Sequence, residues 1–175
     1  MRKLLLLLAL CVTLPLQATE AHKEIGWEAL VPKGWDPTQD LKALLGSGNL
    51  QDSDPRAMEA LEKMKALWDS APTEPSLAGA RIRLPGYAIP LESKGGKVTE
   101  FLLVPYFGAC IHSPPPPANQ IVHAISAKAL KDMRSMDAIW VNGTLSLHRA
   151  DTPWGKAGYR LAVDKIAPYE AARKK

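Results

Sequence analysis

The sequence predicts a mainly β fold of the α+β class, a five-stranded OB-like Greek-key barrel with an N-terminal helical extension. Five apolar or alternating stretches follow one another from residue 80 onward, each bounded by glycine, proline or other turn residues. The first of these stretches is interrupted by Pro85-Gly86, as expected for a strongly bent strand. The predicted order of three strands, a short helix and two strands is that of an OB-type barrel.

Residues 1–21 have the pattern of a signal peptide. Arg2 and Lys3 precede thirteen apolar or small residues, 4–16, a run too short to cross a bilayer as a helix. Small residues follow, so cleavage is expected after Ala18 or Ala21. The mature protein is therefore predicted to be periplasmic. Lipid attachment at Cys11 is the less favoured alternative, because the bulky Leu10 precedes it.

The mature chain divides into three parts. Residues 22–76 form the predicted extension with two helices, 77–170 the barrel, and 171–175 a basic tail. Without Arg2 and Lys3, 20 basic residues face 18 acidic ones, so the net charge is only about +2. No basic stripe with interleaved aromatic residues is present, which argues against a nucleic-acid partner. No further segment of the mature chain is long and apolar enough to span a membrane.

Two helices are predicted in the extension. Thr38 is a suitable cap for a short helix whose leucines at 41, 44 and 45 share one face and which ends at Gly46. Asp54-Pro55 starts a second helix, with apolar residues at helical spacing to Trp68. This apolar stripe predicts packing against a sheet.

The first two barrel strands form a predicted hairpin. Ile82 and Leu84 alternate with polar residues, and then Tyr87, Ile89 and Leu91 are apolar on the opposite parity. An alternation that changes parity at a glycine predicts a β-bulge at Pro85-Gly86. A tight turn at residues 94–97 leads into a central strand over 98–106.

The rest of the barrel follows a proline-rich loop. Residues 120–125 form a short predicted third strand, and 126–136 can form a short helix with three apolar residues. Strands four and five are predicted at 139–147 and 159–163, joined by turn-forming residues at 149–155.

Residues 107–120 hold the candidate functional site. Cys110 and His112 lie two residues apart, just before four consecutive prolines and the amides of Asn119 and Gln120. Once the signal peptide is removed, Cys110 is the only cysteine, so it cannot form an internal disulfide. It must then be buried, bound to a metal, reactive, or paired with another molecule.

A metal site is one interpretation of this segment. If the second strand runs on through His112, Cys110 can lie opposite His123 on the third strand, with all three side chains on one face. One thiolate and two imidazoles suit zinc, and less favourably copper, with a fourth position open. The site would serve metal binding or delivery.

Three alternatives remain open. Cys110 can be a small buried thiol, and the histidines can simply be hydrogen-bonded. A neighbouring imidazole could instead activate Cys110 as the nucleophile of an enzyme, although no third catalytic group is evident. Finally, a metal-free adaptor could dock an envelope or transporter protein through the loop. The partner-binding residues would be Pro114, Pro115, Pro116, Pro117, Asn119 and Gln120, with the prolines exposed.

The run from Phe107 to Gln120, Phe-Gly-Ala-Cys-Ile-His-Ser and four prolines followed by Ala-Asn-Gln, resembles an uncharacterised family of small exported bacterial proteins, a domain of unknown function. The resemblance is close over 83–92 and 100–122, and looser at 141–143 and 159–166. It implies export and an association with ABC-type transport and metal handling. It implies no activity.

Overall fold

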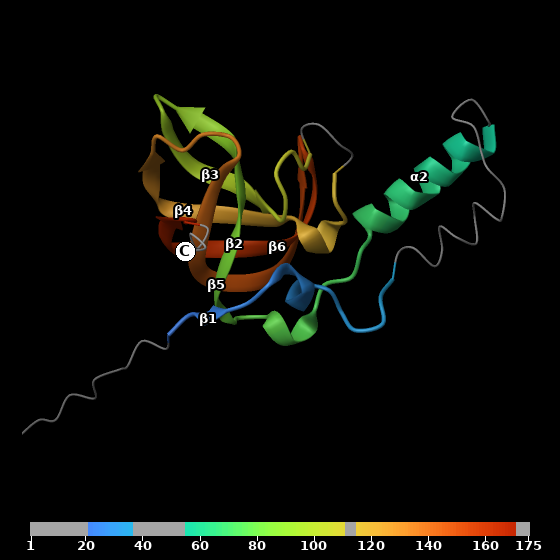
Figure 1. Ribbon diagram of the computed structural model, residues 1–175, viewed down its shortest axis with the longest axis horizontal. Coiled ribbons are helices and arrows are strands. Elements are labelled where there is room, and N and C mark those ends of the chain that lie inside the picture. The colour runs from blue at the N-terminus through green and yellow to red at the C-terminus, as the bar shows by residue number, and fades with distance from the viewer. Residues whose placement is uncertain (1–20, 37–54, 111–114, 171–175) are drawn as a thin grey trace, which may run out of the picture.

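The computed structural model describes residues 21–36, 55–110 and 115–170. Five strands close a barrel in the order β2-β3-β4-β6-β5, with β5 pairing back onto β2 (Figure 1). The strands are β2 (Arg81–Lys94), β3 (Lys97–Val104), β4 (Val122–Lys131), β5 (Asp137–Thr152) and β6 (Gly155–Pro168). A two-residue strand, β1 (Lys23–Glu24), adds to β2 in parallel. The OB-like barrel predicted from the sequence is therefore confirmed.

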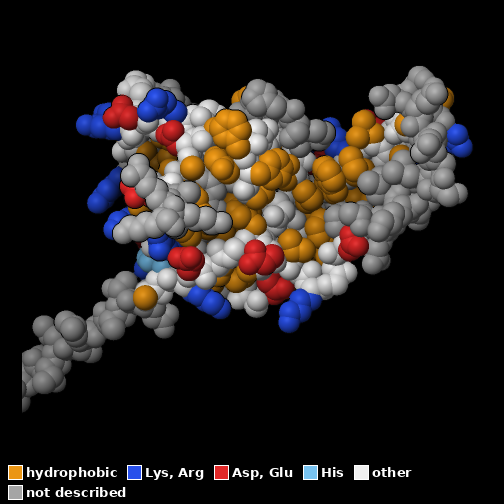
Figure 2. Space-filling model, viewed as in Figure 1, with side chains coloured by type: hydrophobic (Ala, Val, Ile, Leu, Met, Phe, Trp, Pro, Cys, Tyr) orange, Lys and Arg blue, Asp and Glu red, His pale blue; other side chains and the backbone are white. Residues whose placement is uncertain are grey.

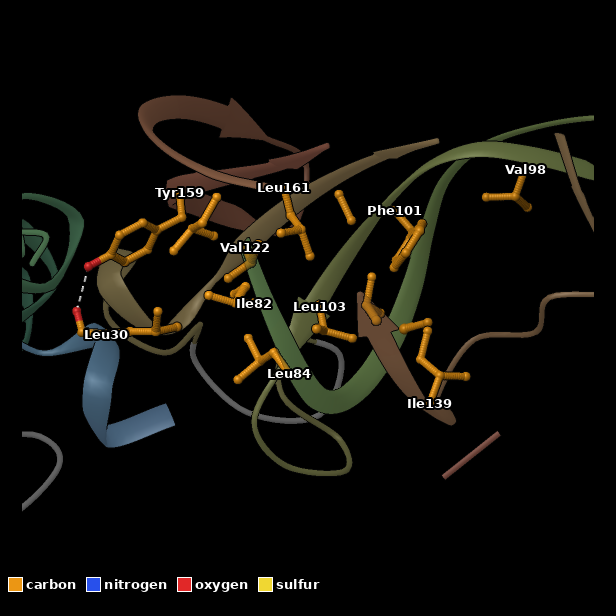
Figure 3. Close-up of a cluster of buried hydrophobic side chains, with 14 residues drawn as sticks. Leu30, Ile82, Leu84, Val98, Phe101, Leu103, Val122, Ile139, Tyr159 and Leu161 are labelled. Atoms are coloured by element: carbon orange, nitrogen blue, oxygen red, sulfur yellow. Dashed lines mark hydrogen bonds between the residues drawn. The ribbon is translucent and has the colours of Figure 1, made fainter. Parts of the chain in front are cut away.

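The barrel interior is filled by one side of each strand. Ile82 and Leu84 of β2 meet Phe101 and Leu103 of β3, and Leu161 of β6 lies in the same cluster (Figure 3). These side chains are fully or almost fully buried, and their removal from water is the main source of stability of such a fold. Apolar residues alternate along the strands because every second side chain points into the barrel interior, as predicted from the sequence.

The predicted bulge at Pro85-Gly86 is wrong. β2 pairs with β5 without a register shift from Arg81 to Ala88, and the β2–β3 ladder is irregular only around Pro90 to Ser93. Ile82, Leu84 and Ala88 all belong to the interior cluster, so the parity does not change. Ile89, with Tyr87 and Leu91 beside it, packs in a second cluster that is described below. The apparent change of parity arises because both faces of this strand become apolar.

The predicted helix at 126–136 is also wrong, because β4 continues to Lys131. Val98 of β3 pairs with Leu130, and Lys97 pairs with Lys131. Leu130 packs against the core, so sheet pairing overrides the helix-forming tendency of the two nearby alanines. The strand ends at Lys131 and is followed by Asp132, whose φ of 59° is left-handed.

One α-helix, α2 (Pro55–Asp69), is present among the described residues, as predicted. It extends away from the barrel (Figure 1), and all its residues except Ala60 are exposed or half-buried. The predicted packing of its apolar stripe against a sheet is therefore wrong. The other predicted helix, at 38–46, lies outside the described residues. The described ranges also contain three short 3-10 helices, η1 (Trp27–Leu30), η2 (Pro75–Leu77) and η3 (Ala118–Gln120). None of the helices in the described ranges could span a bilayer.

The N-terminal segment is joined to the barrel through one tyrosine. The buried hydroxyl of Tyr159 donates to the carbonyl oxygen of Leu30 at 2.6 Å and accepts from the Glu74 amide at 2.5 Å. Leu30 itself belongs to the interior cluster (Figure 3). The extension therefore completes the core at this end of the barrel.

Candidate functional site

The segment between β3 and β4 covers the outer face of the barrel. Ala109 and Cys110 from this segment pack with Leu102, Val104 and Ile121 in a second apolar cluster, which also holds Ile89 and Ala157. Strands β3 and β4 are the second and third strands of the barrel, the face on which OB folds usually bind oligonucleotides or sugars. In this protein the chain itself occupies that part of the face.

Cys110 lies in the turn that follows β3, with a left-handed φ of 65°. Its thiol is half-buried and forms no disulfide in the described part of the chain. Burial raises the pKa of the Cys110 thiol to about 11. At neutral pH the residue is therefore a thiol rather than a thiolate, which disfavours the nucleophilic role considered above.

The predicted register that placed Cys110 opposite His123 is wrong. β3 ends at Val104, and His123 pairs with Leu102. Paired residues place their side chains on the same face of a sheet, and Leu102 belongs to the cluster that contains Cys110. His123 and Cys110 thus lie toward the same outer face of the barrel, though not as strand partners.

His123 is almost completely buried and has one oriented ring nitrogen. Its Nε2 lies 3.1 Å from Oε2 of Glu100, and a carboxylate can only accept, so Nε2 carries the proton. The other nitrogen, Nδ1, is buried and has no hydrogen-bond partner in the structure. A carboxylate that holds one nitrogen and leaves the other free is the usual setting of a metal-binding histidine.

The remaining predicted ligand, His112, lies outside the described residues. Within the ranges that are described, no three His, Cys, Asp or Glu side chains gather as a metal would require. Metal binding through Cys110, His112 and His123 therefore stays a prediction.

The expectation that the prolines are exposed is wrong where the structure describes them. Pro116 is buried, and Pro115 and Pro117 are half-buried. A Cβ placed on Gly155 would lie 2.8 Å from the Cβ of Pro115, so this proline packs directly on the start of β6. Pro114 lies outside the described residues. The described prolines therefore pack against the barrel. Their rings are apolar, and they have no backbone N–H that would need a hydrogen-bond acceptor when buried.

Asn119 and Gln120 tie this segment to the N-terminal extension. The fully buried Asn119 donates through Nδ2 to the carbonyl oxygen of Pro72 at 2.9 Å. Gln120 donates through Nε2 to the carbonyl oxygen of Trp27 at 3.0 Å. The two amides satisfy backbone groups that belong to segments far away in the sequence.

Two adjacent aromatic residues of this segment are exposed. Phe107 is 67% exposed and Tyr106 is 46% exposed, and the Phe107 ring meets Tyr87 edge-on at 5.8 Å. Gly108 donates to Sδ of Met136 at 3.3 Å, which holds this turn against the barrel. We define Tyr106 and Phe107 as the aromatic turn. Sequence reasoning missed it, although two adjacent aromatic residues directly after a strand were a visible signal.

A hollow of about 160 Å³ lies next to the aromatic turn. It is lined by residues from five separate segments: Trp27, Pro85, Gly86, Tyr87, Pro105, Ala138 and Tyr169. Sequence reasoning could not find this site, because only the closed barrel brings these segments together. Figure 2 shows hydrophobic side chains gathered across one face of the barrel and on toward α2.

The topology places this protein in the class of OB-like barrels, with part of the usual ligand-binding face covered by its own chain. The family model of DUF3299, proteins of unknown function, matches residues 27–168, so the chain belongs to that family. A crystal structure of a DUF3299 family protein from Pseudomonas aeruginosa PAO1 is similar, with 38% sequence identity and a TM-score of 0.66. The match covers 87% of this chain and 99% of that one.

Two further solved structures have low similarity. Asparaginyl-tRNA synthetase from Pyrococcus horikoshii, complexed with asparaginyl-adenylate, is 18% identical with a TM-score of 0.36, over 56% of this chain and 21% of that one. A small single-stranded DNA-binding protein from Streptomyces coelicolor is 9% identical with a TM-score of 0.32, over 52% of this chain and 94% of that one. Neither similarity bears on what this chain binds. A search of the curated proteins found no match.

Proposed function

We propose that this protein is an exported, non-enzymatic adaptor of the bacterial envelope that docks a protein partner through the aromatic turn. The observation that carries the proposal is the exposure of Phe107 and Tyr106 in a turn that is otherwise firmly packed. Large exposed aromatic side chains on a rigid support are typical anchors of protein interfaces, because they bury much apolar area at little entropic cost. The prolines then support the turn rather than contact the partner.

Export is supported by the pattern of residues 1–21, and it predicts a periplasmic mature chain without lipid. A transporter component is one envelope partner that fits this location.

Site-specific photocrosslinking tests the docking surface. A photoreactive phenylalanine analogue is placed at position 107 and, as a control, at position 147, where Leu147 is 40% exposed elsewhere on the barrel. We expect an adduct of one defined mass from position 107 in cells and none from position 147. Adducts of the same masses from both positions, or none from either, would contradict the proposal.

Metal binding is the second candidate, favoured by the buried, unpartnered Nδ1 of His123 and its orienting contact with Glu100. We propose zinc, or less favourably copper, held by His123, Cys110 and His112. The thiolate must form on binding, so the affinity should fall as the pH falls.

Metal analysis of tag-free protein separates the two candidates. The metal candidate predicts about one zinc per chain, loss of the metal in Cys110→Ser, and weakened binding in Glu100→Gln, which removes the orienting charge. A Glu59→Gln variant, altered at an exposed helix position, is the matched control. Absence of bound metal in the wild-type protein at micromolar zinc would remove this candidate and leave the adaptor.

A further inference from the structure

We propose that the hollow beside the aromatic turn is a binding site for a quaternary ammonium group, such as the trimethylammonium of choline. Its wall contains three aromatic residues, Trp27, Tyr87 and Tyr169, which come from three different segments of the chain. A small hollow with several aromatic residues is the arrangement that recognises such cations, because π-electron faces attract positive charge without hydrogen bonds. Among the residues that the structure describes, no charged side chain lines it.

The engaged indole of Trp27 favours a cation over a ligand that needs this N–H as a donor. Grooves that bind proline-rich peptides are aromatic too, but they also need donors for the peptide carbonyls. Here the indole Nε1 of Trp27 already donates to the carbonyl oxygen of Pro85 at 2.7 Å. A trimethylammonium group has no hydrogen-bonding requirement, so this bond can persist in the complex while fixing the ring in place.

Acidic rather than basic residues are the sequence neighbours of the residues that line the hollow. The charged residues directly adjacent in sequence to its lining residues are Glu28, Asp137 and Glu170, and all three are acidic. Figure 2 shows carboxylates along the lower border of the hydrophobic face, together with Lys or Arg side chains. A partly desolvated cation is stabilised by nearby negative charge as well as by the aromatic rings.

A neighbouring contact shows the same chemistry. The guanidinium carbon of Arg83 lies 4.0 Å from the ring centre of Trp140, and this ring packs 5.3 Å from Tyr169. Arg83 is paired with Glu24 at 3.1 Å, so its charge is compensated on the surface. Trp140 does not line the hollow, so the contact of Arg83 with Trp140 leaves Trp27, Tyr87 and Tyr169 available to a bound cation.

The experiment is a titration of the folded mature protein, followed by NMR of the tryptophan indole N–H signals. Trp27 is assigned from the signal that disappears in Trp27→Phe. Choline is compared with 3,3-dimethyl-1-butanol, which has the same shape but no charge. We expect choline to shift the Trp27 signal saturably, and the neutral compound to bind at least tenfold more weakly. Equal binding of both would overturn the proposal, because the hollow would then be merely apolar.

Matched variants locate the site. Tyr169→Ala should weaken choline binding at least tenfold, whereas Leu147→Ala, an exposed apolar residue outside the hollow, should leave it unchanged. Thermal melts of both variants confirm that they are folded. If Tyr169→Ala is unstable, Tyr87→Leu serves instead, with the same expected loss. Unchanged choline binding in a folded wall variant would overturn the proposal.

Two further experiments identify where the ligand comes from and which chemical class it belongs to. Cosedimentation with phosphatidylcholine vesicles but not with phosphatidylglycerol vesicles would indicate a lipid headgroup, whereas binding of choline alone would indicate a free solute. A proline-rich decapeptide that shifts Trp27 when choline does not would overturn the proposal in favour of a peptide groove. The result is independent of the adaptor function, because no partner protein is present.

Discussion

At the scale of single residues, Tyr159 and Cys110 illustrate two ways in which burial acts on a polar group. The hydroxyl of Tyr159 has both a donor and an acceptor bond to the backbone, so its burial is compensated. Burial without a compensating charge instead raises the pKa of Cys110 to about 11 and keeps it neutral. The first residue holds segments together, and the second is chemically quiet.

Tyr159→Phe should lower the free energy of unfolding by about 1–3 kcal/mol, because the buried carbonyl of Leu30 and the amide of Glu74 lose their partner. Urea denaturation measures this change. Tyr106→Phe, which removes an exposed hydroxyl, is the control and should change stability little. A similar change in the free energy of unfolding for both variants would show that water replaces the missing hydroxyl of Tyr159.

Alkylation of Cys110 by iodoacetamide should be slow at pH 8. The rise of its pKa from 9.0 to about 11 reduces the thiolate population about 100-fold, while the greater intrinsic reactivity of a more basic thiolate recovers about tenfold. The net rate should therefore be about tenfold below that in urea, and it should keep rising with pH up to about 11. Mass spectrometry of mature protein without residues 1–21 follows the reaction. A rate that levels off below pH 9 would contradict the raised pKa.

At the scale of elements, the C-terminal end of α2 is held by an arginine of β5, a strand far along the sequence. The guanidinium of Arg149 on β5 donates to the carbonyl oxygens of Asp69, Ser70 and Ala71 at 2.7–3.0 Å. The last carbonyls of a helix have no partner within the helix, and a cation there also opposes the negative end of its dipole. One arginine thus binds the carbonyl groups at the C-terminal end of the helix and ties that end to β5.

Arg149→Gln should loosen α2 without unfolding the barrel. Its shorter, uncharged amide cannot reach three carbonyls, so amide hydrogens in the last turns of α2 should exchange faster. Hydrogen exchange followed by mass spectrometry measures this, with peptides from β3 and β4 as internal reference. Arg134→Gln is the control, an exposed arginine on the β4–β5 turn. Faster exchange throughout the barrel would instead mean that Arg149 stabilises the whole fold.

At the scale of the whole molecule, the N-terminal extension and the barrel share one core. Leu30 lies in the interior cluster, Trp27 accepts from Gln120 and lines the hollow, and Pro72 accepts from Asn119. The hollow therefore exists only when residues from both parts are in place. A boundary near residue 76 separates sequence patterns, but the contacts cross it repeatedly.

A chain of residues 77–175 alone should consequently fail to fold cooperatively. It lacks Leu30 and the backbone partners of Tyr159 and Asn119, so a buried cluster and two buried polar groups would face water. Circular dichroism melts compare it with residues 22–175. A sharp transition in the shorter chain would show that the barrel is an independent domain.

The sequence by itself determined the barrel and the segment that covers it. The strands, turns and helix start were predicted from local patterns. These patterns were the alternation in β2 and β5, the turn residues between strands, and Pro55 at the start of α2. The run of residues 107–120 was likewise visible as the place of interest. The helix assigned to 126–136 failed because pairing with β3 outweighed local propensity.

Only the tertiary structure decided which residues meet. The register of β4 against β3 set Leu102, not Cys110, opposite His123, because strand length and pairing are settled by the whole sheet. Burial of Pro116 follows from packing that no local pattern reports. The hollow of Trp27, Tyr87 and Tyr169 joins positions up to 142 residues apart, and only closure of the barrel brings them together. Local patterns specify strands and turns, whereas sites built across strands depend on long-range contacts.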